Sequence, residues 1–119
     1  GINQDGISDL KNLQILCAWD NEKIYNVNHL ANILIELDCE DNCGIDQEGI
    51  KDLKVLVKLN ANNNCGINNV GHLANTLIKL NCGYESGINQ KGIKDLKILQ
   101  KLNANNNSKI KMSIIWRIL

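Results

Sequence analysis

The stretch GIDQEGIKDLKVLVKLNANNNCG, residues 44–66, is spelled twice more, with few changes, in this chain of 119 residues. Residues 1–16 read GINQDGISDLKNLQIL, and residues 87–107 read GINQKGIKDLKILQKLNANNN. A second phrase alternates with the first, reading IYNVNHLANILIELDCEDN over residues 24–42 and INNVGHLANTLIKLNCGYE over residues 67–85. A repeat with a period of 20–50 residues is typical of proteins that stack one small unit on the next, because no single unit can bury its apolar face alone.

The repeating unit is about 21.5 residues long. Its length follows from the isoleucines that open the units, which are 22 and 21 residues apart in alternation: Ile2, Ile24, Ile45, Ile67, Ile88 and Ile110. The repeat array is expected to span residues 1–110 and to comprise five units: 1–23, 24–44, 45–66, 67–87 and 88–109. We call the first, third and fifth of these the odd units, and the second and fourth the even units.

A leucine pattern lies inside every unit. In the third unit it reads Leu56-x-x-Leu59-x-Ala61-x-x-Asn64, and it recurs in the same register in the other four. Cys39 and Cys82 replace the alanine in the even units, and Glu85 replaces the asparagine in the fourth. This pattern resembles the leucine-rich repeat, whose consensus is L-x-x-L-x-L-x-x-N/C-x-L. The phrases also resemble the Asn-, Ile- and Lys-rich repeat proteins of large DNA viruses or of protists with A+T-rich genomes.

The resemblance implies an α/β fold, a right-handed solenoid that forms a segment of a curved horseshoe. It implies a parallel β-sheet on the concave side, short α or 3₁₀ helices on the convex side, and about five coils of 21–22 residues. The residue patterns agree with this expectation. Leu59 and Ala61 alternate with polar residues at the period of a strand, and Val27, Leu30 and Leu34 share one face of a helix.

Asparagines are expected to form a structural ladder at the bend after each strand. An asparagine side chain both donates and accepts, so it can satisfy backbone groups of its own coil and of the next. The predicted ladder consists of Asn21, Asn42, Asn64 and Asn107. The glycines that follow the bend, Gly44, Gly66 and Gly87, are expected to provide a tight turn or a positive φ.

Outward-pointing strand residues are expected to form columns on the concave side, the surface that such solenoids commonly use for binding. The candidate partner-binding residues begin with an apolar group, Ile15, Cys17 and Trp19. Acidic residues follow in the second unit: Glu36, Asp38 and Glu40. Lysines and asparagines, with one tyrosine, complete the set: Lys58, Asn60, Asn62, Lys79, Asn81, Tyr84, Lys101, Asn103 and Asn105.

Two interpretations of this surface remain open. In the first, a protein partner grips Trp19 as an aromatic anchor and matches the charges farther along. In the second, Ile15 and Trp19 pack beneath a preceding unit, and the charges only solvate the sheet.

The composition and motifs favour a non-enzymatic protein–protein interaction module, expected to be a segment of a longer repeat protein. Lysine plus arginine and aspartate plus glutamate each number 13, which argues against a nucleic-acid or anionic membrane partner. No catalytic motif is visible, and no cofactor is expected. Two alternatives remain: the substrate-recognition segment of a larger regulatory protein such as a ubiquitin-ligase receptor, or a degenerate gene fragment without activity. The expected location is cytoplasmic, in the host cytoplasm if the protein is viral.

Cysteines and histidines are predicted to have structural roles. Cys43 and Cys65 occupy equivalent positions in adjacent units, so a disulfide between them is geometrically open, although small buried fillers would also fit there. His29 and His72 are two coils apart, too far to hold one metal ion, and are expected on the helix surface. The acidic group of the second unit lacks the spacing of a calcium loop. No metal site is therefore predicted.

Residues 111–119 interrupt the repeat. The period requires another even unit, whereas the chain reads KMSIIWRIL. One set of codons for this segment, read in a neighbouring frame, encodes Asn-Val-Asn-His-Leu-Ala-Asn-Thr, the phrase that the repeat requires. The tail is thus either a frameshift product or a divergent end strand, which the coding DNA would distinguish. In both cases an uncapped coil is expected there, with possible end-to-end self-association.

Overall fold

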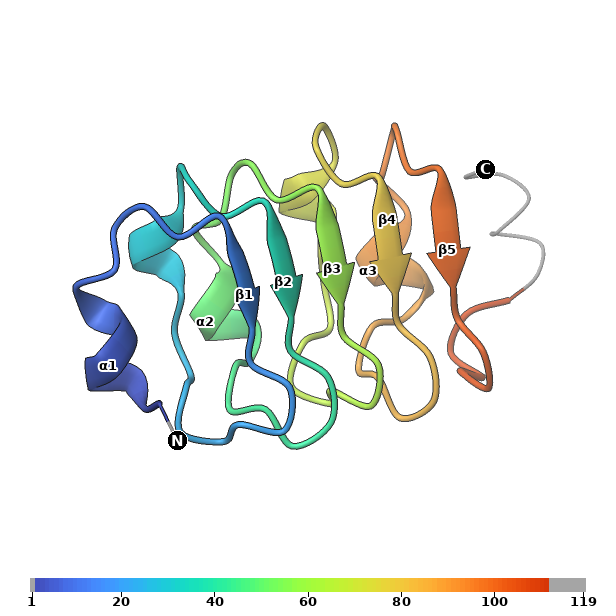
Figure 1. Cartoon of the computed structure of the whole chain (residues 1–119). Coiled ribbons are helices and arrows are strands. Elements are labelled where there is room, and N and C mark those ends of the chain that lie inside the picture. The colour runs from blue at the N-terminus through green and yellow to red at the C-terminus, as the bar shows by residue number, and fades with distance from the viewer. Residues whose placement is uncertain (1, 112–119) are drawn as a thin grey trace.

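The computed structural model describes residues 2–111 of the chain. They form a compact α/β fold with a five-stranded parallel sheet (Figure 1). The strands follow one another in sequence order: β1 (Ile15–Cys17), β2 (Glu36–Asp38), β3 (Lys58–Asn60), β4 (Lys79–Asn81) and β5 (Lys101–Asn103). Each strand has only three residues and comes from a different one of the five units. The predicted parallel sheet is confirmed.

The strands pair in the register that the leucine pattern predicts. The middle leucines of neighbouring strands are paired from one edge of the sheet to the other: Leu16, Leu37, Leu59, Leu80 and Leu102. Because the side-chain period of a strand is two, a slip of one residue would exchange the buried and outward faces. The register therefore places the residues before and after each leucine on the opposite, uncovered face of the sheet.

Short helices cover one face of the sheet, and their type alternates between units (Figure 1). The odd units contribute α1 (Gln4–Ser8), α2 (Gln47–Ile50) and α3 (Gln90–Ile93). The even units contribute the 3₁₀ helices η1 (Asn28–Leu30) and η2 (Gly71–Leu73). Each α-helix begins after a residue whose side chain accepts a hydrogen bond from the amide three positions on: Asn3, Asp46 and Asn89. The expected α or 3₁₀ segments are confirmed.

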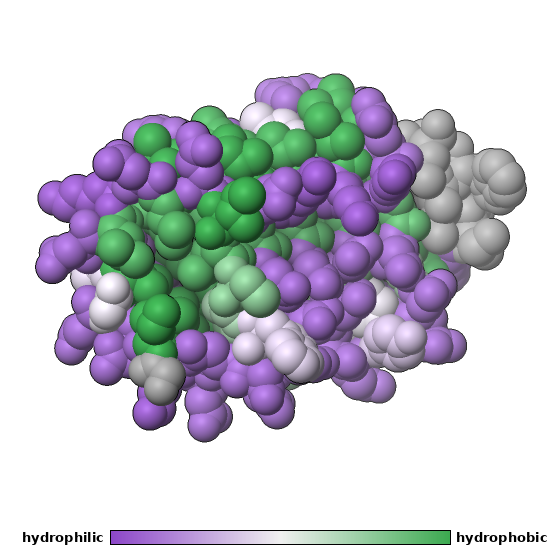
Figure 2. All heavy atoms as spheres, viewed as in Figure 1, coloured by the Kyte–Doolittle hydropathy of each residue, from purple (hydrophilic) through white to green (hydrophobic). Residues whose placement is uncertain are grey.

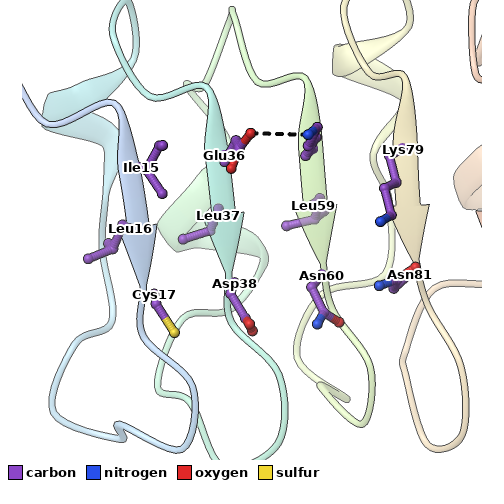
Figure 3. Close-up of a pocket in the computed structure, with 11 residues that line it drawn as sticks. Ile15, Leu16, Cys17, Glu36, Leu37, Asp38, Leu59, Asn60, Lys79 and Asn81 are labelled. Atoms are coloured by element: carbon purple, nitrogen blue, oxygen red, sulfur yellow. Dashed lines mark ion pairs between the residues drawn. The ribbon is translucent and has the colours of Figure 1, made fainter.

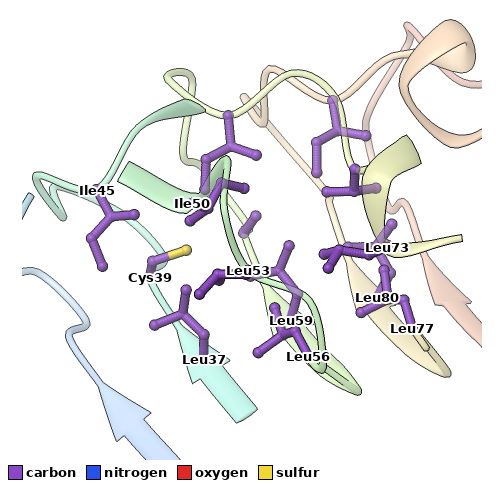
Figure 4. Packing of buried hydrophobic residues seen from close by; sticks show 14 of the residues in the cluster. Leu37, Cys39, Ile45, Ile50, Leu53, Leu56, Leu59, Leu73, Leu77 and Leu80 are labelled. Atoms are coloured by element: carbon purple, nitrogen blue, oxygen red, sulfur yellow. The ribbon is translucent and has the colours of Figure 1, made fainter. Parts of the chain in front are cut away.

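The core lies between the sheet and the helices (Figure 4). Leu37, Leu59 and Leu80 of the three inner strands are at most 2 % exposed. Next to them the smaller residues Cys39 and Cys82 are fully buried, and Ile and Leu side chains from the helical segments fill the remaining space. One continuous core therefore runs through all five units.

Polar side chains of the helical segments tie the first and third units to the even units that follow them. The Gln47 amide donates to the Asn69 carbonyl at 2.9 Å, and its oxygen accepts from the Asn68 and Asn69 amides at 3.0 Å. Gln4 makes the same three bonds in the first pair of units. We call this arrangement the glutamine clamp. It satisfies backbone groups that lie on neither a helix nor a strand.

The two histidines also link neighbouring units. Nε2 of His29 lies 2.9 Å from the Ile7 carbonyl oxygen, and Nε2 of His72 lies 3.1 Å from the Ile50 carbonyl oxygen. Both carbonyls belong to the ends of α-helices, where the last carbonyls lack helical partners. Each side chain is exposed, as expected, but it has a structural partner that the sequence did not reveal.

The bend after each strand contains the left-handed residue, and it is never a glycine within residues 2–111. The residues with positive φ, between 56° and 60°, are Asp20, Asp41, Asn63, Tyr84 and Asn106. None of Gly44, Gly66 and Gly87 has a positive φ, so of the two alternatives expected for these glycines, a tight turn or a positive φ, the second was wrong. Gly44 and Gly87 are needed for close approach instead: a Cβ there would lie 2.4 Å from the Glu22 carbonyl oxygen and 2.6 Å from that of Cys65.

The asparagines at the bend are buried in the third and fifth units, and that of the first unit, Asn21, is half-buried. Asn64 donates to the Cys39 and Ile45 carbonyls at 2.8 and 3.0 Å, and it accepts from the Gly66 amide at 2.9 Å. Asn107 repeats this set of bonds, and Asn21 makes part of it.

Asn42 requires a correction, because it is exposed and does not take the buried position. In the even units the next residue, Cys43 or Ser86, takes that position. There Cys43 Sγ lies 3.5 Å from the Ile45 amide, and Ser86 Oγ accepts from the Ile88 amide at 3.3 Å. Glu85, which stands where the pattern has asparagine, is exposed for the same reason.

From residue 112 onward, the predicted tail and its self-association lie outside the described residues.

Candidate interaction surface on the open face of the sheet

On the face of the sheet opposite the helices, which we call the open face, no other helix or strand of residues 2–111 covers the strands. The first residues of the strands form one column, ordered Ile15, Glu36, Lys58, Lys79 and Lys101. The third residues form a second column, ordered Cys17, Asp38, Asn60, Asn81 and Asn103. Ten of the fifteen candidate residues therefore share one surface.

The remaining candidates lie at the ends of the strands. Trp19, Glu40, Asn62 and Asn105 follow their strands by two residues, and Gly83 holds the equivalent place in the fourth unit. Tyr84 is instead one of the left-handed bend residues and is 46 % exposed. It borders the open face rather than belonging to a column.

A hollow of about 230 Å³ lies between the first two columns. Figure 3 shows the side chains of both columns around it, with Ile15 and Cys17 at one end and Lys79 and Asn81 at the other. Glu36 and Asp38 line it in between. The hollow thus crosses four strands, β1 to β4, and changes in character from apolar through acidic to basic.

The apolar end of the open face is well exposed. Ile15 is 64 % exposed and Trp19 is 55 % exposed. Figure 2 shows apolar surface gathered over the β1 end, whereas hydrophilic residues gather over β3 and β4. The Trp19 indole is held in place, because its Nε1 donates to Asp41 Oδ2 at 2.6 Å. A held aromatic ring loses little side-chain freedom on binding.

The charges on the open face are only partly paired. Lys58 Nζ lies 3.3 Å from Glu36 Oε1 (Figure 3), and Glu40 Oε2 accepts from Asn60 Nδ2 at 2.7 Å. Asp38 Oδ1 accepts from the Glu40 amide at 3.2 Å. Within residues 2–111, neither Asp38 nor Lys79 belongs to an ion pair.

The electrostatic strain of the acidic part is visible at Glu40. Burial raises the pKa of its carboxyl above the ordinary 4.5, the negative charges of Asp38 and Asp41 raise it further, and the bond from Asn60 opposes the rise. A cation placed here would relieve this repulsion.

The asparagines of the open face are largely occupied by their own backbone. Asn62 Oδ1 accepts from the Gly83 amide at 2.7 Å. Asn60 and Asn103 each accept from the amide two residues on, at 3.2 and 3.1 Å. These bonds add to the backbone bonds between units, which continue past the strand ends, as from Asn63 N to Gly83 O at 3.2 Å. The asparagines therefore shape the surface more than they offer free polar groups to a partner.

All five cysteines lie in the described part and are free thiols. Cys39 and Cys82 are fully buried, whereas Cys17 and Cys65 are exposed. Burial raises the pKa of Cys82 from 9.0 to about 12 and that of Cys39 well above its usual range. The disulfide between Cys43 and Cys65 stays a hypothesis. Both residues line a second hollow, which lies at the bend after the strands.

Thiol labelling is expected to separate these cysteines. A maleimide at pH 7 should modify Cys17 and Cys65 in the folded protein, and Cys39 and Cys82 only after unfolding. A rise of the Cys82 pKa from 9.0 to about 12 lowers its thiolate fraction about a thousandfold. Timed labelling followed by peptide mass spectrometry measures the rates, with a urea-unfolded sample as control. Equal rates for Cys39 and Cys17 in the folded protein would contradict this burial pattern.

No three His, Cys, Asp or Glu side chains among residues 2–111 converge in a way that could hold a metal ion. Over the same residues, every helix is too short to cross a bilayer. Comparison of the chain with protein families and with curated proteins finds no match.

Proposed function

We propose that the chain is a leucine-rich-repeat solenoid and that its open face, the concave face of such a fold, binds a protein partner without catalysis. The five-unit parallel stack and the leucine register support the fold assignment. The observation that carries the function is the hollow between the first two columns, with exposed Ile15 at its apolar end. Soluble proteins rarely expose grouped apolar side chains beside a hollow unless something binds there.

The experiment is selection of a random-peptide display library on the intact protein, followed by measurement of the enriched peptides on two variants. Ile15→Ser removes the apolar end of the hollow. Ile98→Ser is the matched control, because Ile98 is also an exposed isoleucine, 43 % exposed, but does not line the hollow.

We expect the enriched peptides to bind Ile15→Ser about tenfold more weakly than the unaltered protein, since one exposed aliphatic contact contributes about 1–2 kcal/mol. Their affinity for Ile98→Ser should be unchanged. Circular dichroism checks that both variants fold. Peptides that are indifferent to Ile15→Ser, or a library that yields none, would overturn the proposed function.

A further inference from the structure

We infer that the partner presents an extended segment that lies across the strands and carries an apolar, a basic and an acidic side chain, in that order, at every second residue. This inference rests on the proposed function and specifies its ligand. The apolar side chain would lie over Ile15, the basic one against Asp38 and the acidic one against Lys79.

The apolar position follows from the shape and exposure of the β1 end. Ile15 and Cys17 stand on either side of the hollow there, and Ile15 is 64 % exposed. A partner side chain that enters between them removes apolar surface from water on both molecules. No charged side chain of β1 lines this end, so an apolar partner residue is favoured over a polar one there.

The basic position follows from the pairing of the two carboxylates that line the hollow. Glu36 already has Lys58 as its partner at 3.3 Å. Asp38 has a backbone amide only and faces the repulsion of Glu40 nearby, which also raises the pKa of Glu40. A lysine or arginine of the partner would supply the missing cation.

The acidic position follows from the lysines. Lys58 is the partner of Glu36, so Lys79 is the cation of the hollow that is left without a carboxylate among the described residues. A carboxylate of the partner would complete this end. Opposite charges at the two positions fix which end of the segment lies toward β1, whichever way its chain runs.

The spacing of the three positions matches an extended chain. Neighbouring strands are about 4.8 Å apart, so measured across the strands Asp38 is one step from Ile15, about 5 Å, and Lys79 is three steps, about 14 Å. Asp38 also belongs to the other column, two residues or about 7 Å farther along its strand. Alternate residues of an extended segment point the same way and are about 6.7 Å apart, which places its second and third such residues at about 7 and 13 Å. Long basic and acidic side chains absorb the remaining difference.

The test uses four synthetic peptides of one composition, flanked by glycine and serine. Two carry Leu-Ser-Arg-Ser-Glu and its reversed order Glu-Ser-Arg-Ser-Leu, because the surface does not set the chain direction. Two carry the charge-exchanged orders, Leu-Ser-Glu-Ser-Arg and its reverse. Dissociation constants come from NMR titration of the intact protein, at low salt and at 0.5 M salt.

We expect one of the first two peptides to bind about tenfold more tightly than its charge-exchanged counterpart, since two pairs change from favourable to unfavourable at a partly exposed site. Salt should reduce this preference. The variant Asp38→Asn with Lys79→Gln should abolish it, whereas the control variant Asp52→Asn with Lys97→Gln, two exposed residues outside the hollow, should retain it.

Other outcomes overturn the inference in distinguishable ways. If the charge-exchanged peptides bind as well and Ile15→Ser weakens all of them, the order of charges is wrong and the proposed function stands. If none of the four binds while display peptides do so through Ile15, the inference fails and the proposed function again stands. If no peptide of either kind depends on Ile15, both fail.

Discussion

Replacing Gly49 with alanine is expected to lower the free energy of unfolding by about 3 kcal/mol. A Cβ at this position would lie 2.1 Å from the Tyr25 carbonyl oxygen, a backbone atom of the preceding unit. Rotation of a side chain cannot relieve this clash, so the two units must move apart. The Val27 amide would then lose its 2.9 Å hydrogen bond to the Gly49 carbonyl. Urea denaturation followed by circular dichroism measures the loss.

Gly6 offers a matched control, because it holds the same position in the first unit. The nearest atom to a Cβ there is Cγ2 of the exposed Ile2 side chain, at 3.0 Å. Gly6→Ala should change the free energy of unfolding by no more than about 0.5 kcal/mol, and the higher helix propensity of alanine favours a gain. If the two variants unfold at the same urea concentration, close packing between units is not what requires glycine at position 49.

Asn64→Ala is the second substitution with a large expected effect, a loss of about 2–3 kcal/mol. The change leaves the carbonyls of Cys39 and Ile45 and the amide of Gly66 without the partner that the side chain provides. Asn64 is only 3 % exposed, so water cannot replace these bonds without opening the bend. The measurement is again the free energy of unfolding in urea.

Asn42→Ala makes the same chemical change at the equivalent place of the second unit. Asn42 is exposed, so we expect a difference of about 0.5 kcal/mol or less from the unaltered protein. A loss at Asn42 as large as that at Asn64 would show that burial of the asparagine side chain does not determine how much it stabilises the fold.

Much of the fold could be predicted because the same residue pattern occurs in all five units. The column Leu16, Leu37, Leu59, Leu80 and Leu102 has one spacing pattern, and the parallel sheet follows from that pattern once each leucine pairs with the next. The helical segments were also predictable, from the apolar spacing of Val27, Leu30 and Leu34. These features depend on burial periodicity, which sequence displays directly.

The bend could not be predicted in the same way. Odd and even units have the same number of residues from strand to opening isoleucine, yet they bury different positions, Asn64 in one and Ser86 in the other. The left-handed residue is Asp, Asn or Tyr, so composition alone points to the wrong place when glycines stand nearby. The choice depends on backbone bonds across units, such as Gly44 N to Asn21 O at 3.1 Å, that no single phrase reveals.

The candidate site was predictable as a set of outward positions but not as a working surface. Alternation along each strand assigns Ile15, Asp38 and Lys79 to one face. This alternation does not show which charges form ion pairs. Nor does it show that the side-chain oxygen of an asparagine such as Asn62 accepts a hydrogen bond from a backbone amide. Those properties depend on side-chain conformations, and they decide which groups are left for a ligand.

The glutamine clamp has a consequence for how this protein changes length. Because backbone groups of each described even unit receive their bonds from Gln4 or Gln47 of the odd unit before it, an even unit needs an odd predecessor. Excision of residues 45–66 would bring two even units together, whereas excision of residues 45–87 would leave odd and even in their natural order. Insertions and deletions that preserve the fold should therefore come in blocks of 43 residues. A pair of coils, and not a single coil, is the smallest segment that can be added or removed.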